Sequence, residues 1–344
     1  MRGYAPGAGG VEALCKRLHQ RRGKLIPMRA ILVTAFGGPE VLVPADIAEP
    51  EAGPEQLLVH VDRAGVNYAD THQVEDSYLS RTRLPLVPGG EVVGRTPDGR
   101  RVVALVDGGG YAELAVANAR QAFEVPDGVD DVSALALVVQ GATAWILLHR
   151  TTQVQPGESV VVHAAAGGVG SLAVQLAKAM GAGRVIATAS TDEKRELALS
   201  LGADVAVDPD ADDLTAALRE ANGGRRVDAV LDMTGGEVTD RSLAALAPFG
   251  RLAFYGMASR RPPTPVAPAS LLAHSTSISG MWLPHAFSVP GLVHSAMDAL
   301  FAAVLDGSLR VVAGGEYPLS GARRAHEDLR ARRTVGKLVL DPSR

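Results

Sequence analysis

The chain has 344 residues, 47% of them hydrophobic and 21% charged, which is the balance of a globular protein with room for two domains. Its formal net charge of −4 gives no general attraction for nucleic acid or an anionic membrane, and aromatic residues make up only 4%, too few for a base-stacking surface. No run of about 18 apolar residues is evident, so we expect no membrane span. Cys15 is the only cysteine, which excludes an internal disulfide and predicts a reducing, cytoplasmic setting.

Residues 1–27 differ in character from the rest of the chain. They carry five clustered basic residues without the apolar stretch of about 7–15 residues that a secretory signal needs. The segment also contains no serine, which gives little support to a transit peptide. At Met28 the pattern changes to an apolar strand, MRAILVTAF. We expect an N-terminal extension or over-extended start without stable structure, and a functional targeting segment is the alternative.

From Met28 to about residue 150 the sequence is dominated by short strands separated by glycine and proline. The predicted strands are RAILVTAF, EQLLVHVDRAGV, EVVGR, RRVVALV and YAELAVAN. The first long helical pattern is VSALALVVQGATAWILLHR. This organisation predicts a compact, mainly β domain of barrel-like or mixed type.

After Pro156 strands and helices alternate. The predicted strands are SVVVHA, RVIATA, DVAVD, VDAVLDMTG, RLAFYGM and TSISGMW, and the helices between them include DEKRELALSLGA, DDLTAALREA and DRSLAALAPFG. Continuously apolar strands that alternate with amphipathic helices predict a parallel sheet covered on both faces.

The remaining tail has a helix around 291–305, a strand near RVVAGGEYPL, a helix near 321–332 and a final strand KLVL. We therefore expect residues 28–150 and 288–344 to form one domain, with residues 151–287 inserted as a doubly wound α/β domain.

The stretch VVVHAAAGGVGSLAVQLAKAMGA, residues 160–182, joins an apolar strand to a helix through a glycine cluster. A helix N-terminus presents unpaired backbone N–H groups and a partial positive charge, which together stabilise an anion such as a pyrophosphate. The spacing is Ala164-x-x-Gly167-x-x-Gly170, with alanine where the usual dinucleotide motif has its first glycine. We expect Gly167 and Gly168 to allow positive φ and the close approach of a ligand, and Gly170 to allow close helix–strand packing. The loop residues predicted to bind the cofactor are Ala166, Gly167, Gly168, Val169 and Gly170.

The second strand of this domain decides which dinucleotide is expected. NAD sites place an acid at the end of that strand, about 20 residues after the glycines, to bind the ribose 2′-OH. Here the strand ends in Ala189 and Ser190. Asp192 and Glu193 follow, but they suit the first turn of a helix opened by a capping box that starts at Ser190. Ser190, Lys194 and Arg195 could instead hold a 2′-phosphate, so the sequence favours NADPH over NADH.

The chain resembles the medium-chain dehydrogenase/reductase superfamily, and within it the zinc-free, zeta-crystallin-like quinone oxidoreductase family. The motifs that carry the resemblance from Met28 to the C-terminus are MRAILVTAFGGPEVL, AGVNYADTH, LPLVPGGEVVG, GGGYAELAVA, QGATAW, HAAAGGVGSLAVQLAK, FGRLAFYGMAS, SGMWL and RRTVGKLVL. The resemblance implies a GroES-like catalytic domain, a Rossmann domain, a cleft between them and a homodimer. It also implies NADPH-dependent reduction of quinones or other α,β-unsaturated carbonyls.

The sequence lacks the zinc ligands of the zinc-dependent enzymes, in agreement with the resemblance to the zinc-free family. The GHE motif of zinc alcohol dehydrogenases reads Gly89-Gly90-Glu91 here, and the nine histidines have no ligand spacing. We therefore expect no metal.

Catalytic candidates come from GVNYADTH. By resemblance, Asn67 and Asp70 line the substrate site, where Asn67 can donate a hydrogen bond to a carbonyl. Asp70 either orients its neighbours or acts only as a loop cap. His72 stands where many family members have a tyrosine, so either His72 or a nearby tyrosine, Tyr68 or Tyr78, could supply a proton.

The resemblance adds further cofactor candidates. Thr143 matches a threonine near the nicotinamide ribose, although a buried helix hydroxyl bonded to its own turn would explain it as well. Gly256 follows the fifth strand of the parallel sheet, and Met281 and Leu283 belong to the segment expected to pass the carboxamide. Lys337 resembles a position near the cofactor, although an ordinary surface charge would explain a lysine near the C-terminus as well.

Two other functions remain open from the sequence. An enoyl-thioester reductase would use the same hydride step on a carrier-bound substrate. A non-catalytic NADPH-binding protein would keep the dinucleotide site alone.

Overall fold

The computed structural model describes residues 27–344, which form two compact units. The first comprises the described residues up to Leu135 together with Gly314–Thr334 and Leu338–Arg344. The second comprises Ala136–Ala313 and Val335–Lys337. The predicted N-terminal extension, apart from Pro27, and Cys15 lie outside the described residues.

Antiparallel sheets dominate the first unit, as the short glycine- and proline-bounded strands predict. Its two-stranded sheet pairs β1 (Pro27–Leu32) with β2 (Val43–Ala48). Its seven-stranded sheet has the order β14-β15-β3-β4-β5-β7, with β6 paired to β3. The strands of this sheet are β3 (Gln56–Val66), β4 (Glu91–Arg95), β5 (Arg101–Leu105), β6 (Leu114–Asn118), β7 (Ala122–Glu124), β14 (Ala313–Pro318) and β15 (Lys337–Asp341).

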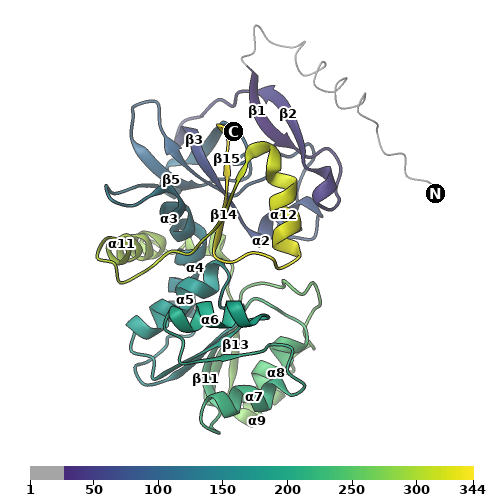
Figure 1. Cartoon of the computed structure of the whole chain (residues 1–344), viewed down its shortest axis with the longest axis vertical. Coiled ribbons are helices and arrows are strands. Elements are labelled where there is room, and N and C mark those ends of the chain that lie inside the picture. Colours follow the sequence, from purple (N-terminus) through teal and green to yellow (C-terminus); the bar gives the residue numbers. More distant parts are fainter. Residues whose placement is uncertain (1–26) are drawn as a thin grey trace, which may run out of the picture. The chain divides into compact units, whose positions relative to one another are not determined.

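The C-terminal tail returns to this unit, as predicted. Strand β15 pairs antiparallel with β3, with Leu338 opposite Val66. Helix α12 (Ala322–Arg330), yellow in Figure 1, contacts the short helix α2 (Tyr68–Val74), which is far from it in sequence. Segments from both ends of the chain therefore share one apolar core, formed mainly by valine, leucine and alanine side chains of the strands.

The second unit contains the parallel sheet. Its strand order is β10-β9-β8-β11-β12-β13, so the strands of this unit run 3-2-1-4-5-6 in chain order. This is the doubly wound order of dinucleotide-binding domains. The strands are β8 (Ser159–Val162), β9 (Arg184–Thr188), β10 (Val205–Val207), β11 (Val227–Asp232), β12 (Leu246–Phe254) and β13 (Ser277–Gly280), all paired in parallel.

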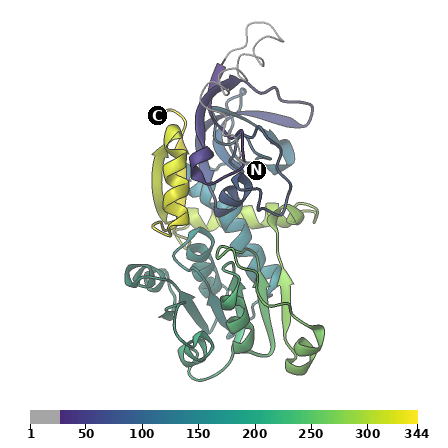
Figure 2. The same cartoon turned by 90° about the vertical axis from the view of Figure 1, so that its right-hand side faces the viewer.

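Helices pack on both faces of this sheet, which Figure 2 shows from the side. They are α5 (Gly168–Ala179), α6 (Asp192–Ser200), α7 (Leu214–Ala221), α8 (Glu237–Ala245) and α9 (Pro268–His274). Helices α10 (Leu283–Ala286) and α11 (Leu292–Leu305) follow in the chain. Helix α8 ends at Ala245, five residues before the end of the predicted pattern, and the chain continues as β12. Pro248 and Gly250, which are unfavourable inside a helix, account for this early end.

The predicted helix after residue 131 is continuous over Asp131–Thr151 and includes α3 (Asp131–Ala136) and α4 (Ala142–Ile146). Two stretches of it, Leu137–Gly141 and Leu147–Thr151, are π-helical. By length and composition alone it could cross a membrane, but 78% of its most apolar window is buried inside the protein.

The two units divide the chain differently from the predicted boundaries at residues 150 and 288. Residues 136–150 and 288–313 belong to the second unit, because α4 packs on α5 and α11 packs on α4. Apolar periodicity predicts a helix but not the domain against which its apolar face packs, so the predicted boundaries differ from those of the two units.

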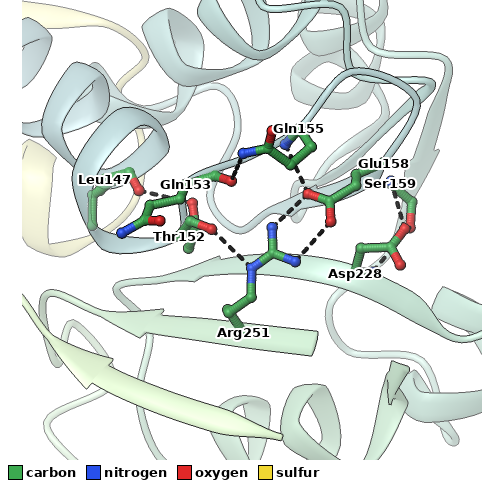
Figure 3. A network of polar contacts seen from close by, with 8 residues as sticks. All are labelled: Leu147, Thr152, Gln153, Gln155, Glu158, Ser159, Asp228 and Arg251. Carbon is green, nitrogen blue, oxygen red and sulfur yellow. Dashed lines mark hydrogen bonds and ion pairs between the residues drawn. The ribbon is translucent and has the colours of Figure 1, made fainter. Parts of the chain in front are cut away.

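A charged network joins the long helix to the parallel sheet (Figure 3). The Arg251 guanidinium on β12 donates to both Glu158 carboxylate oxygens, at 2.8 and 2.5 Å, and to the Thr152 carbonyl at 2.8 Å. Glu158 also accepts a hydrogen bond from the backbone N–H of Gln155. The hydrogen bond from Arg251 is the main cause that lowers the pKa of Glu158 below its ordinary value. It outweighs the effect of burial, which alone would raise this pKa.

We predict that Glu158→Gln lowers the free energy of unfolding by about 1–3 kcal/mol at neutral pH, because it weakens a half-buried, charge-assisted pair. Since the pKa of Glu158 is lower in the folded than in the unfolded state, this stability is present above about pH 4 and is lost as the pH falls through the folded value. Urea denaturation of the wild type and the variant at several pH values measures this difference in the free energy of unfolding.

Glu237→Gln is the matched control for this experiment. It alters another Glu–Arg pair, with Arg241, but both side chains are exposed, so its effect should stay below about 0.5 kcal/mol. Equal losses in the two variants would show that the Arg251 network does not stabilise this unit.

Candidate cofactor and substrate sites

The loop between β8 and α5 forms the tight connection predicted from its glycines. Gly170 is essential to the packing, because a Cβ there would lie 2.3 Å from the Ala164 carbonyl oxygen and 2.7 Å from the Cα of Ala165. Gly168 is also crowded, since a Cβ there would meet the Gln140 side chain at 2.2 Å. The loop thus brings the N-terminus of a 12-residue helix, with its unpaired N–H groups, to the carboxyl end of a buried strand.

One detail of the loop prediction is wrong. Gly167 and Gly168 do not adopt positive φ; the left-handed residue is Ala164, with φ of 51°. The turn therefore places its strained conformation where the usual motif has its first glycine. The two glycines instead leave room for close neighbours.

The C-terminal segment docks on this loop. Gly336 donates its backbone N–H to the Ala166 carbonyl at 2.9 Å and has φ of 51°, and a Cβ there would lie 2.0 Å from the Val312 carbonyl oxygen. Lys337, next in the chain, is 1% exposed. Of the two alternatives, the structure therefore places Lys337 inside the protein, one residue from a contact with the glycine loop, and not at the surface.

The segment after β9 carries the residues predicted to select the cofactor. Helix α6 begins at Asp192, where the pattern DEKRELALSLGA begins, but its N-cap is Thr191 and not Ser190, because Thr191 is extended and its hydroxyl accepts from the Lys194 N–H at 3.3 Å. Ser190 therefore lies outside the helix, half-buried, at the end of the strand. Arg195 lies within this same segment and donates to the Ala189 carbonyl at 2.8 Å.

The other cofactor candidates also belong to the second unit. Gly256 follows β12, and Met281 follows β13 and donates its N–H to the Phe254 carbonyl at 3.0 Å. Leu283 opens α10 and is buried. These positions lie at the carboxyl ends of the parallel strands, the edge at which the glycine loop also lies. Thr143 is buried in α4, at 7% exposure.

Gln140 is a residue that the sequence prediction missed. It lies in the first π-helical stretch, three residues before Thr143, and its amide packs directly over Gly168. π-Helical turns are rare and are frequent at functional sites. The motif QGATAW contained this glutamine, but helical periodicity did not predict that its side chain would contact the glycine loop.

The catalytic candidates belong to the first unit, where Asn67 precedes α2. The Asn67 amide donates to Glu91 Oε1 at 2.6 Å. One Asp70 oxygen, Oδ2, accepts both from the backbone N–H of Asn67 at 2.8 Å and from the Tyr111 hydroxyl at 2.9 Å. Asp70 therefore fixes the start of α2, which agrees with the orienting and capping roles proposed for it.

The network continues to α12, where His326 Nε2 lies 3.0 Å from the Tyr111 oxygen. Burial lowers the pKa of His326 to about 4, and burial, followed by the nearby Asp70 charge, raises the pKa of Tyr111. Both side chains are therefore neutral at pH 7. Because the Tyr111 hydroxyl donates to Asp70, His326 must donate its Nε2–H to Tyr111, which defines its tautomer.

His72 lies on the next turn of α2 from Tyr68. The two rings meet edge to face at 5.5 Å, and His72 Nδ1 lies 2.9 Å from the Ser77 hydroxyl. His72 is buried at 9% exposure. The structure thus brings the four predicted catalytic residues together around the first turns of one short helix.

Glu91, Tyr111 and His326 were not predicted as site residues. Glu91 and Tyr111 lie within the quoted motifs LPLVPGGEVVG and GGGYAELAVA, so a signal for them existed. His326 had none, because it lies 215 residues from its partner Tyr111 in the chain. Across residues 27–344, no group of three or more His, Cys, Asp and Glu side chains is arranged to hold a metal ion.

We predict that Gly170→Ala lowers the free energy of unfolding by about 1–3 kcal/mol, because the new methyl group must displace α5 from the loop. Gly167→Ala is the control in the same loop, where the nearest atom would be 3.2 Å away, and it should cost less than about 1 kcal/mol. Denaturant titration of the two variants measures both losses in the free energy of unfolding. A larger loss for Gly167→Ala than for Gly170→Ala would contradict the prediction.

Comparisons with known proteins agree with this architecture. The family model described as "Alcohol dehydrogenase GroES-like domain" matches residues 53–127, and the one described as "Zinc-binding dehydrogenase" matches residues 168–301. These matches confirm the predicted combination of a GroES-like domain and a Rossmann domain.

The relatives cover nearly the whole chain. A quinone oxidoreductase of Pseudomonas aeruginosa is 33% identical over 330 residues, 91% of this chain and 99% of that protein. A 2-haloacrylate reductase of a Burkholderia species is 33% identical, over 91% of this chain and 98% of that protein. Among solved structures, a mycobacterial protein complexed with NADPH superposes with a TM-score of 0.87 at 40% identity, covering 92% of this chain and 100% of that one. This chain therefore belongs to the quinone oxidoreductase family of the medium-chain dehydrogenase/reductase superfamily.

Proposed function

We propose that this chain is an NADPH-dependent, zinc-independent oxidoreductase that transfers a hydride to a quinone or another α,β-unsaturated carbonyl. The observation that carries the proposal is the glycine loop at the N-terminus of α5, on a sheet of strand order 3-2-1-4-5-6. The relatives support it, since one is a quinone oxidoreductase, another a 2-haloacrylate reductase, and a third was solved with NADPH.

The loop fits a dinucleotide on its own geometry. The space beside Gly170 is closed by backbone, while α5 begins at Gly168 with its first N–H groups unpaired by the helix. Ala166, Gly167, Gly168 and Val169 would hold the pyrophosphate there, and Ser190, Lys194 and Arg195 the 2′-phosphate. When bound, NADPH supplies the hydride from its nicotinamide ring.

We propose that residues at the carboxyl ends of the strands and beside the loop orient the nicotinamide ring. The proposed set is Thr143, Gly256, Met281, Leu283 and Lys337. Gln140 joins this set, because its amide packs on Gly168 and so shapes the loop from the side of the long helix.

In the first unit, Asn67 would polarise the substrate carbonyl. Its amide donates to Glu91, which orients the side chain. In the proposed role the Asn67 amide donates to the substrate carbonyl oxygen, on which negative charge grows as the hydride is added. Asp70 holds Asn67 in place through the backbone hydrogen bond; Tyr111 holds Asp70, and His326 in turn holds Tyr111.

The reduced substrate also needs a proton. Hydride addition to an enone or quinone leaves an enolate or phenolate, which can take its proton from solvent. His72 is the candidate donor in the chain, with Tyr68 against its ring, and Tyr78 as the further alternative.

Zinc independence rests on the donor groups of the chain. Gly90 stands where the zinc enzymes carry a histidine, and Glu91 beside it is engaged by Asn67. We further propose a cytoplasmic homodimer.

The function is tested by mixing the protein with NADPH and 1,2-naphthoquinone, a simple cyclic enone or crotonyl-CoA, each repeated with NADH. We expect NADPH oxidation with the quinone or the enone, unaffected by a zinc chelator. Turnover of crotonyl-CoA alone would indicate an enoyl-thioester reductase instead, and tight NADPH binding without any turnover would indicate a non-catalytic protein.

Asn67→Ala should lower kcat/KM for the carbonyl substrate by about 10²-fold, the usual effect of losing one donor to a developing oxyanion. The dissociation constant of NADPH should stay within about twofold, because the dinucleotide residues belong to the other unit. Gln73→Ala, on the same helix, is the control and should keep full activity. A loss of NADPH affinity equal to the loss of kcat/KM would contradict the assigned role.

A further inference from the structure

Arg195 is proposed to bind the 2′-phosphate, yet its guanidinium already has three oxygen partners. It donates to the Ala189 carbonyl at 2.8 Å and to the Asp192 carboxylate at 2.5 Å, and it lies 3.6 Å from Asp208 Oδ2. Its side chain is only 21% exposed. A phosphate can gain the full attraction of this cation only by competing with these acids.

Asp208 differs from Asp192 in how it is held. Asp192 is three residues from Arg195 on the same helix and its side chain is 84% exposed, so it can turn aside into solvent at little cost. Asp208 follows β10, and the hydrogen bond from the Ala189 N–H to the Val207 carbonyl fixes that strand end beside β9.

The orientation of the Asp208 carboxylate is also defined. Its Oδ1 accepts the backbone N–H of Asp210 at 3.0 Å, which leaves Oδ2 facing Arg195. Asp208 is thus an anion held at a strand end, next to the segment that would receive a second anion. Two negative groups that share one cation at this range oppose each other, although solvent weakens the effect.

We propose that Asp208 sets the cofactor preference of this chain: its carboxylate competes with the 2′-phosphate of NADPH for Arg195 and so weakens the discrimination against NADH. The inference rests on the proposed dinucleotide function, and it adds a specificity-determining residue to it. NADH has a hydroxyl at this position and no phosphate, so its binding does not require Arg195 to leave Asp208.

The test is the pair of dissociation constants for NADPH and NADH, measured by fluorescence titration at low ionic strength, where charge effects are largest. Asp208→Asn keeps the oxygen that accepts from Asp210 but removes the charge. We expect it to tighten NADPH binding about three- to fivefold. NADH binding should stay within about twofold.

Two further variants separate competition for Arg195 from a general change in charge. Asp212→Asn removes one negative charge from an exposed position four residues further on, and it should shift the ratio of the two constants by less than about twofold. Arg195→Gln should weaken NADPH binding, and adding Asp208→Asn to it should then have no effect on NADPH, because the contested cation is gone.

The outcomes distinguish this inference from the proposed function. If the wild-type protein binds neither dinucleotide, the proposed function fails. If it binds them and Asp208→Asn weakens NADPH, leaves it unchanged, or still tightens it in the Arg195→Gln background, then Asp208 does not compete for Arg195 and the inference is wrong.

Discussion

The dinucleotide site depends on one steric constraint, the contact between Gly170 and the backbone of Ala164 and Ala165. Only a residue without a side chain lets α5 come this close to the turn after β8. That approach brings the helix N-terminus, with its unpaired N–H groups, to the carboxyl edge of the sheet. The long helix with Gln140 and the C-terminal segment with Gly336 then pack against the same loop. Three segments that are distant in sequence therefore pack against the glycine loop.

The first unit depends on a different physical requirement, the pairing of buried polar groups. Asp70, Glu91, Tyr111 and His326 are all less than 5% exposed, and an unpaired polar group at such positions would cost several kcal/mol. Their hydrogen bonds connect the start of α2, β4, the segment before β6, and α12. The start of α2, and with it Asn67, is held in place because these groups must satisfy one another.

In both units, acidic side chains of the chain engage a residue that is proposed to bind a ligand. The acids around Arg195 partly neutralise the charge that would bind a phosphate, and Glu91 engages one of the two N–H groups of Asn67. In each case a group of the chain occupies part of the capacity of a proposed ligand-binding residue. The affinity of these residues for a ligand therefore depends on neighbours that lie elsewhere in the sequence.

The parallel sheet, its helices and the glycine loop could be predicted from the amino-acid sequence, because period-2 and period-3.6 patterns and glycine spacing are local signals. The sequence also grouped Asn67, Asp70 and His72, which lie within six residues. Three features emerge only in the folded protein: Ala164 adopts the left-handed conformation, Lys337 is buried, and Gln140, His326 and Asp208 contact site residues. These contacts join residues that are distant in the chain, and they arise only once sheets and helices pack and buried polar groups find partners. No local pattern encodes them.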